Sequence, residues 1–166
     1  RIRVTDETAA GGSRCLKFLD AQGLDHSYNP HLIYTPNWTR GVVREQFSLR
    51  VEPGAQVVHE WRSAGHPYKV GPRLTIGEDG ALTVAGNQVA HFNHGEWYVF
   101  EISCALGRQA TGTFRFQVKD KLGKVVAEGE PPLPNPRFRA LGWVGFVANA
   151  DAAAVFYLDD FHLVVE

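Results

Sequence analysis

Alternation of apolar and polar residues is the dominant pattern along this chain, and it is clearest over Val42–Glu52. A period of two residues is typical of a β-strand that buries one side and exposes the other. We therefore expect this segment to be a half-buried strand with a polar outer face. The buried side carries Val43, Phe47, Leu49 and Val51, and the polar side carries Arg44, Gln46, Ser48 and Arg50.

The same alternation recurs in short segments that are separated by Gly, Pro, Asn and Asp, and no stretch shows a convincing helical period. About ten short strands without helices are typical of an all-β, two-sheet antiparallel β-sandwich or jelly roll. We expect a single domain over residues 1–166, with a long loop at Gly23–Arg40. The other expected strands are Arg14–Leu19, Val57–Arg62, Arg73–Ile76, Ala81–Ala85, Trp97–Leu106, Gly112–Lys119, Lys124–Glu128, Leu141–Asn149 and Ala154–Val165.

Composition narrows the classes of partner. The formal net charge of -1 provides no basic field for nucleic acid or an anionic membrane. No apolar run approaches the ~20 residues of a membrane helix. Cys15 and Cys104 are expected to be buried free thiols, with a single bridge as the alternative. Because the chain starts at Arg1 and contains no Met, we expect it to be a module of a longer secreted protein.

Two ends of the chain resemble a known family. The segment Glu7–Phe18, with Gly11-Gly12 ahead of a short strand, resembles the opening of bacterial carbohydrate-binding jelly rolls. The segment Phe156–Leu163 resembles their closing strand, and Gly95-Glu96-Trp97 is similar to concanavalin A-like lectin and glucanase sandwiches. The resemblance implies an extracellular or periplasmic module that binds a polysaccharide or oligosaccharide, attached in some cases to a catalytic domain.

The resemblance also implies a structural calcium ion between the first and last strands. Carried over by position, Asp159 would be the carboxylate ligand, with Glu7 and backbone oxygens near Gly12–Arg14 contributing. Calcium takes six to eight oxygen ligands, and a strand-end Asp beside a Gly-rich turn supplies some of them. The alternative is that Asp159 or Asp160 accepts hydrogen bonds from backbone and side-chain groups.

A candidate ligand surface follows from pairing Val42–Glu52 with Val57–Arg62 as a hairpin. With Gly54 and Ala55 at the turn, His59 faces Arg50 and Trp61 faces Ser48. The predicted glycan-binding face then consists of Trp61, His59, Arg44, Gln46 and Arg50. A turn longer by one residue reverses the parity and places Trp61 in the core beside Phe47. The sequence leaves both arrangements open.

Four other aromatic residues are assigned either to this surface or to the core. Trp38 and Tyr68 lie in loops and are candidate sugar platforms, since flat rings suit the apolar faces of sugars. Trp97 and Trp143 lie in apolar alternating strands and are expected in the core. Arg115, Gln117 and Lys119 alternate with apolar residues and so share one polar face. This face is a second candidate part of the ligand-binding cleft.

No catalytic motif accompanies these residues. The Glu-x-Asp-x-x-Glu strand of retaining sandwich glucanases is absent from the sequence. We therefore expect a non-catalytic carbohydrate-binding module. Two alternatives stay open. One is a polysaccharide lyase or glycoside hydrolase on the same sandwich, with Glu60 or His59 as acid/base or a lyase group of His59, Tyr68 and Arg44. The other is a structural accessory domain that packs on a catalytic domain.

Overall fold

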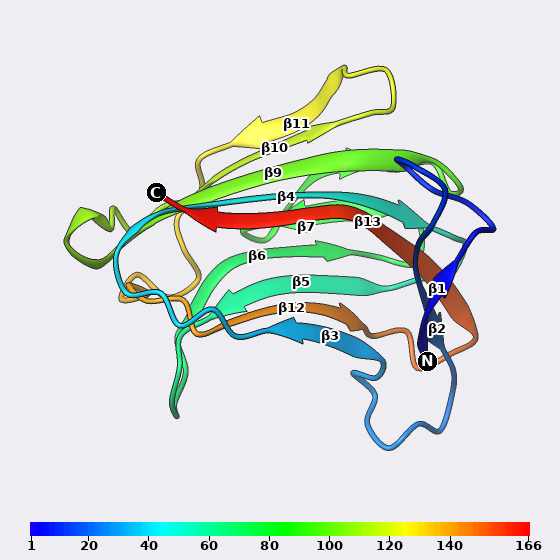
Figure 1. Ribbon diagram of the computed structural model, residues 1–166, viewed down its shortest axis with the longest axis horizontal. Coiled ribbons are helices and arrows are strands. Elements are labelled where there is room, and N and C mark those ends of the chain that lie inside the picture. Colours follow the sequence, from blue (N-terminus) through cyan, green and yellow to red (C-terminus); the bar gives the residue numbers. More distant parts are fainter.

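Two antiparallel sheets stacked face to face make up the protein, and the computed structural model describes all residues, 1–166 (Figure 1). In spatial order, the seven-stranded sheet contains β1 (Ile2–Thr5), β2 (Cys15–Asp20), β13 (Ala154–Val165), β4 (Gly41–Val51), β9 (Trp97–Leu106), β10 (Arg115–Lys119) and β11 (Val125–Gly129). The six-stranded sheet contains β3 (His31–Tyr34), β12 (Trp143–Ala148), β5 (Val57–Arg62), β6 (Val70–Ile76), β7 (Ala81–Val84) and β8 (Asn87–His91).

The predicted all-β sandwich is confirmed. The helical content is a single 3-10 turn, Gly107–Gln109 (η1), so the chain contains no helix with the length and apolar character needed to cross a membrane. Three short strands escaped the sequence prediction. The strands β1 and β8 were not expected, and β3 lies inside the segment predicted to be a long loop.

Aromatic side chains fill the space between the sheets. Phe47 of β4 stacks on Phe100 of the neighbouring β9, with 4.8 Å between ring centroids. It also meets Phe146 of the opposite sheet edge-on, at 4.9 Å. Edge-on and offset contacts of this kind stabilise aromatic pairs beyond the area they bury. The inward faces of the two sheets are therefore joined by ring-to-ring contacts at the centre of the core.

The predicted hairpin of Val42–Glu52 with Val57–Arg62 is wrong. The strand β4 pairs with β13 and β9, whereas β5 pairs with β12 and β6 in the other sheet. The turn at Pro53-Gly54 thus carries the chain across the sandwich, and the apolar faces of β4 and β5 meet through the core instead of lying side by side. This arrangement buries both faces. As a result, His59 and Trp61 are 4% and 0% exposed.

One carboxylate joins the two sheets inside this core. The Oε2 atom of Glu45, on β4, accepts a hydrogen bond from Trp61 Nε1 at 2.8 Å and lies 2.8 Å from His59 Nε2. The other ring nitrogen, His59 Nδ1, lies 2.9 Å from the carbonyl oxygen of Gly145 and must carry a hydrogen, because a carbonyl oxygen only accepts. A second proton must then lie between Nε2 and Oε2, so the Glu45–His59 pair is neutral overall.

Both cysteines are free and buried, as expected. Cys15 lies on β2 and Cys104 on β9, with β13 and β4 between the two strands. Burial raises the pKa of the Cys104 thiol to about 12. Burial also raises the pKa of Cys15, and the nearby charges of Asp159 and Glu7 act in the same direction. Both thiols are therefore held in the protonated, unreactive form.

The buried network predicts a large effect for Glu45→Gln. If the amide oxygen takes the shared position, it accepts from Trp61 but no longer holds the proton shared with His59. If the amide nitrogen takes that position, Trp61 Nε1 loses its acceptor. A buried polar group without a partner costs about 1–3 kcal/mol, so we expect the free energy of unfolding in urea to fall by that amount.

Glu78→Gln is the matched control, because Glu78 lies exposed in the turn before β7. This change should alter stability by less than about 0.5 kcal/mol. Equal stabilities for the two variants would contradict the bridging role of Glu45.

Candidate functional site

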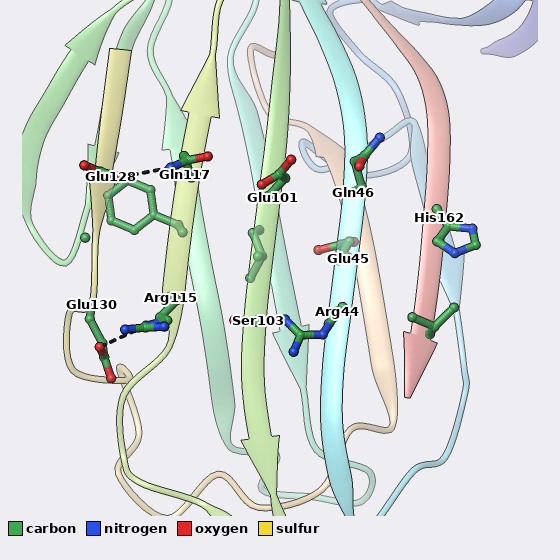
Figure 2. A pocket seen from close by; sticks show the side chains of 14 residues that line it. Arg44, Glu45, Gln46, Glu101, Ser103, Arg115, Gln117, Glu128, Glu130 and His162 are labelled. Atoms are coloured by element: carbon green, nitrogen blue, oxygen red, sulfur yellow. Dashed lines mark hydrogen bonds and ion pairs between the residues drawn. The ribbon is translucent and has the colours of Figure 1, made fainter. Parts of the chain in front are cut away.

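A groove of about 850 Å³ crosses the outer face of the seven-stranded sheet (Figure 2). It runs over five adjacent strands, β13, β4, β9, β10 and β11. Most of its lining is polar, because strand alternation sends the apolar residues of these strands inward to the core. The polar lining comes from Arg44, Gln46, Glu101, Ser103, Arg115, Gln117, Glu128, Glu130 and His162.

The lining side chains form two rows that run across the strands. Pairing of opposite residues in adjacent antiparallel strands places their side chains next to one another on the same face. We call the two sets the first and second rows. The first row contains Val164, Arg44, Ser103, Arg115 and Glu130, and the second contains His162, Gln46, Glu101, Gln117 and Glu128.

Hydrogen bonds and ion pairs hold the β10–β11 end of the groove. In the first row, Arg115 Nε donates to Glu130 Oε2 at 3.1 Å. In the second row, Gln117 Nε2 donates to Glu128 Oε2 at 2.9 Å (Figure 2). These pairs fix the planar end groups of four side chains, so this part of the groove presents hydrogen-bonding groups in defined positions.

The remaining charges of the groove are also paired. Lys119 Nζ, on β10, lies 3.1 Å from Glu101 Oε1. At the opposite side, Arg44 Nε donates to Glu166 Oε2 at 3.1 Å. Both pairs are substantially exposed, so their ion pairing contributes little to stability and the groups remain accessible.

A β-bulge in β13 aims His162 into the groove. Asp159 is opposite Ser48 and His162 is opposite Gln46, so β13 has one residue more than β4 between these two pairs. The backbone of Asp160 takes a left-handed conformation there, with φ of 50°. A bulge of this kind reverses the alternation beyond it. If the same sequence paired regularly without the bulge, Phe161 would lie opposite Gln46, and Leu163 instead of His162 would face outward.

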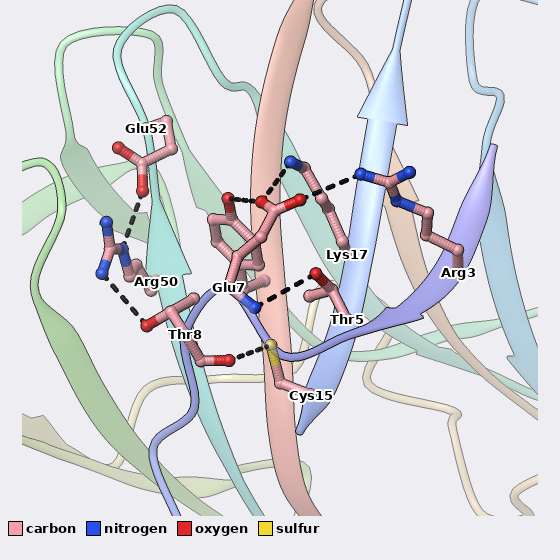
Figure 3. A network of polar contacts seen from close by, with 9 residues as sticks. Arg3, Thr5, Glu7, Thr8, Cys15, Lys17, Arg50 and Glu52 are labelled. Carbon is pink, nitrogen blue, oxygen red and sulfur yellow. Dashed lines mark hydrogen bonds and ion pairs between the residues drawn. The ribbon is translucent and has the colours of Figure 1, made fainter. Parts of the chain in front are cut away.

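The other end of the same sheet face is covered by the N-terminal segment (Figure 3). Thr8 Oγ1 accepts hydrogen bonds from Arg50 Nη1 and Trp97 Nε1, both at 3.2 Å. Arg50 also donates to Glu52 at 2.7 Å, and its guanidinium lies over the ring of Tyr157. Arg50, predicted to bind ligand, is therefore engaged under this segment and does not line the groove.

Glu7 anchors the N-terminal segment to the sheet. Its carboxylate pairs with Lys17 on β2 and with Arg3 at 2.9 Å, and it accepts a hydrogen bond from Tyr157 Oη at 3.2 Å (Figure 3). The hydrogen bond from Lys17 is the main reason that the pKa of Glu7 lies below its ordinary value. The same hydrogen bond raises the pKa of Lys17.

Asp159 fastens the segment at a second point. Its Oδ2 accepts hydrogen bonds from the backbone amides of Ala10 at 2.8 Å and Gly11 at 3.1 Å, and its Oδ1 accepts from the amide of Asp160 at 2.9 Å. The carboxylate of Asp160 lies so close to Gly11 that a Cβ there would be 2.9 Å from it. Glycine at position 11 thus permits the close approach of the segment to β13.

These contacts do not fit the calcium ion predicted at Asp159 and Glu7. The oxygens of Asp159 are engaged by three backbone N–H groups, and Glu7 is engaged by an ammonium and a guanidinium group. No group of three or more His, Cys, Asp or Glu side chains is placed to hold a metal ion. Calcium binding stays a prediction that the chelator measurement below addresses.

The predicted ligand residues divide among different places. Arg44 and Gln46 line the groove. Trp61 and His59 are not on the surface. Of the two arrangements left open by the sequence, the one that places Trp61 in the core is found, and both side chains lie there with Glu45. Trp38 packs partly against the core and borders a separate hollow of about 880 Å³ near η1.

Tyr68 lies on the outer face of the six-stranded sheet, where it stacks on Arg62 at 4.5 Å. The guanidinium of Arg62 also lies over the ring of Trp143 at 4.1 Å, and this ring in turn lies against the backbone of Gly145. Glu60, 2% exposed, pairs with Arg62 and with Arg73 at 3.0 Å. The faces of Trp143 are thus occupied by the protein itself, which leaves it no free sugar platform.

Three further sequence predictions need correction. Trp97 and Trp143 were expected in the core, but both lie half-buried on outer sheet faces. The predicted lyase group of His59, Tyr68 and Arg44 is not formed. His59 lies in the core, Tyr68 on the outer face of the six-stranded sheet and Arg44 on the outer face of the seven-stranded sheet. Glu60 and His59 are buried, so neither reaches a ligand as acid or base.

Several groove residues were missed by the sequence analysis. Glu101 and Ser103 alternate with buried residues of β9, and this alternation was the available signal. His162 gave no such signal, since the bulge that turns it outward breaks the alternation. Glu128 and Glu130 are placed by the pairing of β11 with β10. Arg115 and Gln117, named as a second part of the cleft, do line the groove.

Comparison with known proteins identifies the fold. A scan against protein-family models and a search of curated proteins gave no match. Among solved structures, an alginate lyase from Aplysia kurodai superposes with a TM-score of 0.69 at 11% identity, over 99% of this chain and 87% of that one. A carbohydrate esterase from the Shiga toxin-encoding bacteriophage phi24B gives 0.67 at 12% identity, over 100% and 87% of the two chains.

A third similar structure is the binding domain of botulinum neurotoxin serotype G. Its TM-score is 0.59 at 8% identity, over 100% of this chain and 42% of that one. Similarity at this level of identity shows a shared sandwich fold. Since one fold hosts many functions, the function has to be argued from the groove itself.

The ion pairs of Glu7 predict a pH-dependent stability. Because the pKa of Glu7 is lowered in the folded state, its contribution is present above the unfolded-state pKa and is lost as the pH falls through the folded-state pKa. Glu7→Gln should therefore lower the melting midpoint at neutral pH, by no more than about 3 °C for so exposed a group. The difference from the parent should vanish in acid. A difference that persists unchanged in acid would contradict the ion pairing, and Glu78→Gln should track the parent at every pH.

The contacts of Asp159 predict the effect of removing metal. We expect EDTA to leave the melting midpoint of the parent unchanged. Asp159→Ala should lower the midpoint by about 2–4 °C for each kcal/mol of hydrogen bonding lost. A midpoint that falls in EDTA and recovers with added calcium would show that the ion is bound after all.

Proposed function

We propose that this protein binds a polysaccharide or oligosaccharide non-covalently in the groove of the seven-stranded sheet. The observation that carries the proposal is the pair of polar rows across five strands. A span of five strands is about 19 Å, which gives room for several sugar rings side by side. Amide, carboxylate and guanidinium groups along such a span match the alternating donors and acceptors of sugar hydroxyl groups.

The mode of recognition differs from the aromatic platform expected from the sequence. The apolar members of the lining are Ile102, Phe116 and Val164, and Phe116 is buried. No exposed Phe, Tyr or Trp ring lines the groove, so stacking of sugar rings on such side chains contributes little here. Binding would rest on hydrogen bonds from planar polar groups that strand pairing holds in place.

The structural neighbours support a carbohydrate ligand. Two proteins with the same sandwich fold, and with TM-scores near 0.7, are named for action on carbohydrates: an alginate lyase and a carbohydrate esterase. Together with the polar groove, they favour a glycan over other ligand classes for this chain. They do not distinguish a binding module from an enzyme.

Hydrolysis is the second candidate function, and one observation favours it. Glu101 and Glu128 face the same groove in one row, with β10 between their strands. Strands two apart lie about 10 Å from each other, close to the 6.5–9.5 Å that separates the carboxyl groups of inverting glycosidases. A general acid must give up a proton, whereas Glu101 and Glu128 both accept hydrogen bonds from neighbours in the sheet. We therefore rank binding first.

Two further proposals accompany glycan binding. We propose that the protein acts outside the cell or in the periplasm, where polymeric glycans are encountered. We also propose that it serves a catalytic domain, either by holding that domain near its substrate or by packing against it as an accessory domain. Both follow from the proposed ligand and from the resemblance of the two ends of the chain to carbohydrate-binding jelly rolls.

Gln46→Ala tests the proposed groove directly. Gln46 lies in the second row between His162 and Glu101 and has no hydrogen-bond partner among the groove residues drawn in Figure 2, so its loss should leave the fold intact. Loss of one hydrogen bond of about 1 kcal/mol corresponds to roughly fivefold weaker binding. Retention of parent and variant on a panel of immobilised polysaccharides, measured by affinity electrophoresis, checks this expectation.

Gln88→Ala is the matched control, because Gln88 lies exposed on β8 of the other sheet. It should bind like the parent. Equal binding by Gln46→Ala and the parent would move the site elsewhere, and no retention on any polysaccharide would refute glycan binding. Reducing ends released by the parent, and abolished in Glu101→Gln, would establish hydrolysis instead.

A further inference from the structure

We infer that the glycan held in this groove is uncharged. The inference rests on the proposed carbohydrate-binding function and adds the chemical class of the ligand. It follows from the charge balance of the groove, from the pairing of its charges and from the side chains that remain free. Each of these is a property of the groove residues themselves.

The groove has no net field to attract a polyanion. Two arginines, Arg44 and Arg115, and three glutamates, Glu101, Glu128 and Glu130, line it, a balance of -1. The carboxylate of Glu45 does not count, because it lies in the core with His59. Lys119 and Glu166, which pair with groove residues, add one charge of each sign and leave the balance unchanged.

A polyuronate carries one carboxylate on each sugar. Several such carboxylates aligned along the groove would meet three glutamates in it and two arginines. Like charges brought together at an interface cost free energy and suppress binding of the wrong partner. The alginate lyase that shares this fold is thus a poor guide to the ligand of this chain, since similarity of fold does not extend to the charges on the sheet face.

Each charged group in the groove already has a partner, which is either a group of opposite charge or, for Glu128, a hydrogen-bond donor. Arg115 pairs with Glu130, Arg44 with Glu166, and Glu101 with Lys119. Glu128 accepts from the amide of Gln117. A charged ligand would compete with these pairs for its counter-charge, whereas a hydroxyl group can add to a paired carboxylate or guanidinium without displacing its partner.

Uncharged side chains are the ones left open. Gln46, Ser103 and His162 lie next to one another on β4, β9 and β13, and no polar contact joins them to other groove residues in Figure 2. An amide, a hydroxyl and an imidazole supply both donors and acceptors. These three groups suit the hydroxyls of a neutral sugar, and they lie on the β13–β9 side of the groove.

The test compares polysaccharides of three charge classes. The probes are a linear β-glucan and a mannan as uncharged chains, alginate and polygalacturonate as anionic ones, and chitosan as a cationic one. We expect retention on an uncharged chain and none on alginate or polygalacturonate. Affinity for the uncharged chain should change by less than about twofold between low and high salt, because screening acts on charge–charge attraction only.

A charge-altered variant tests whether the charge balance of the groove is what excludes anionic chains. Replacing all three groove glutamates (Glu101→Gln, Glu128→Gln and Glu130→Gln) changes the balance from -1 to +2 and should create salt-sensitive alginate binding. The control removes the same number of charges from exposed positions elsewhere: Asp25→Asn, Glu78→Gln and Asp151→Asn. The control should gain no alginate binding. Circular dichroism of both variants checks that they fold.

The outcomes separate the inference from the proposed function. Alginate or chitosan retained by the parent as strongly as any uncharged chain, and weakened by Gln46→Ala, would overturn the inference and keep glycan binding in the groove. Equal gain of alginate binding by the groove variant and its control would also overturn it, because net charge would then be the cause. Failure to retain any of the probes would refute the proposed function itself.

Discussion

The two sheets touch through their inward-facing side chains, and this contact determines what every strand can present to solvent. Along β4, the need to bury Val43, Phe47 and Leu49 sends Arg44 and Gln46 outward. Glu45 points to the same side of β4 as these apolar residues, so its carboxylate enters the core and must find hydrogen-bond partners there. His59 and Trp61 of the opposite sheet supply them for Oε2, whereas Oε1 is buried without a partner. A charged residue thus becomes part of the sheet-to-sheet contact, in place of an exposed ligand for sugars.

The outer face of the seven-stranded sheet has a covered end and an open end. At one end, the N-terminal segment covers Arg50 and Trp97 and is fastened by Glu7 and Asp159. At the other end, the side chains of the sheet either pair with one another or stay free, as Gln46 and His162 do, and the groove stays open. The position of the groove therefore depends on where the N-terminal segment crosses the sheet. On the outer face of the six-stranded sheet, Arg62 lies against the rings of Tyr68 and Trp143, and Trp143 lies over the backbone of Gly145.

Local alternation predicted most strands and which side chains of β4 and β10 face outward, since that pattern depends on each strand alone. It did not predict lateral partners. A short turn after β4 serves a hairpin and a crossing between sheets equally well, so Trp61 could be placed only once the partner of β5 was known. Trp97 and Trp143 show a second limit: an outer sheet face buries large rings wherever a segment or an arginine covers them. The bulge at Asp160 shows a third, because one extra residue redirects His162 without changing the apolar pattern before it.

The place of β13 has a consequence for how the chain reaches its native state. The strand lies between β2 and β4, so the seven-stranded sheet is split into two unconnected parts until residues 154–165 arrive. During synthesis, the edges of β2 and β4 stay unpaired until β13, the last strand of the sandwich in sequence order, has been made. Contacts between such distant parts of a sequence slow folding, and unpaired edges invite association with other chains. The unpaired edges of β2 and β4 should thus be prone to association with other chains until residues 154–165 have paired with them.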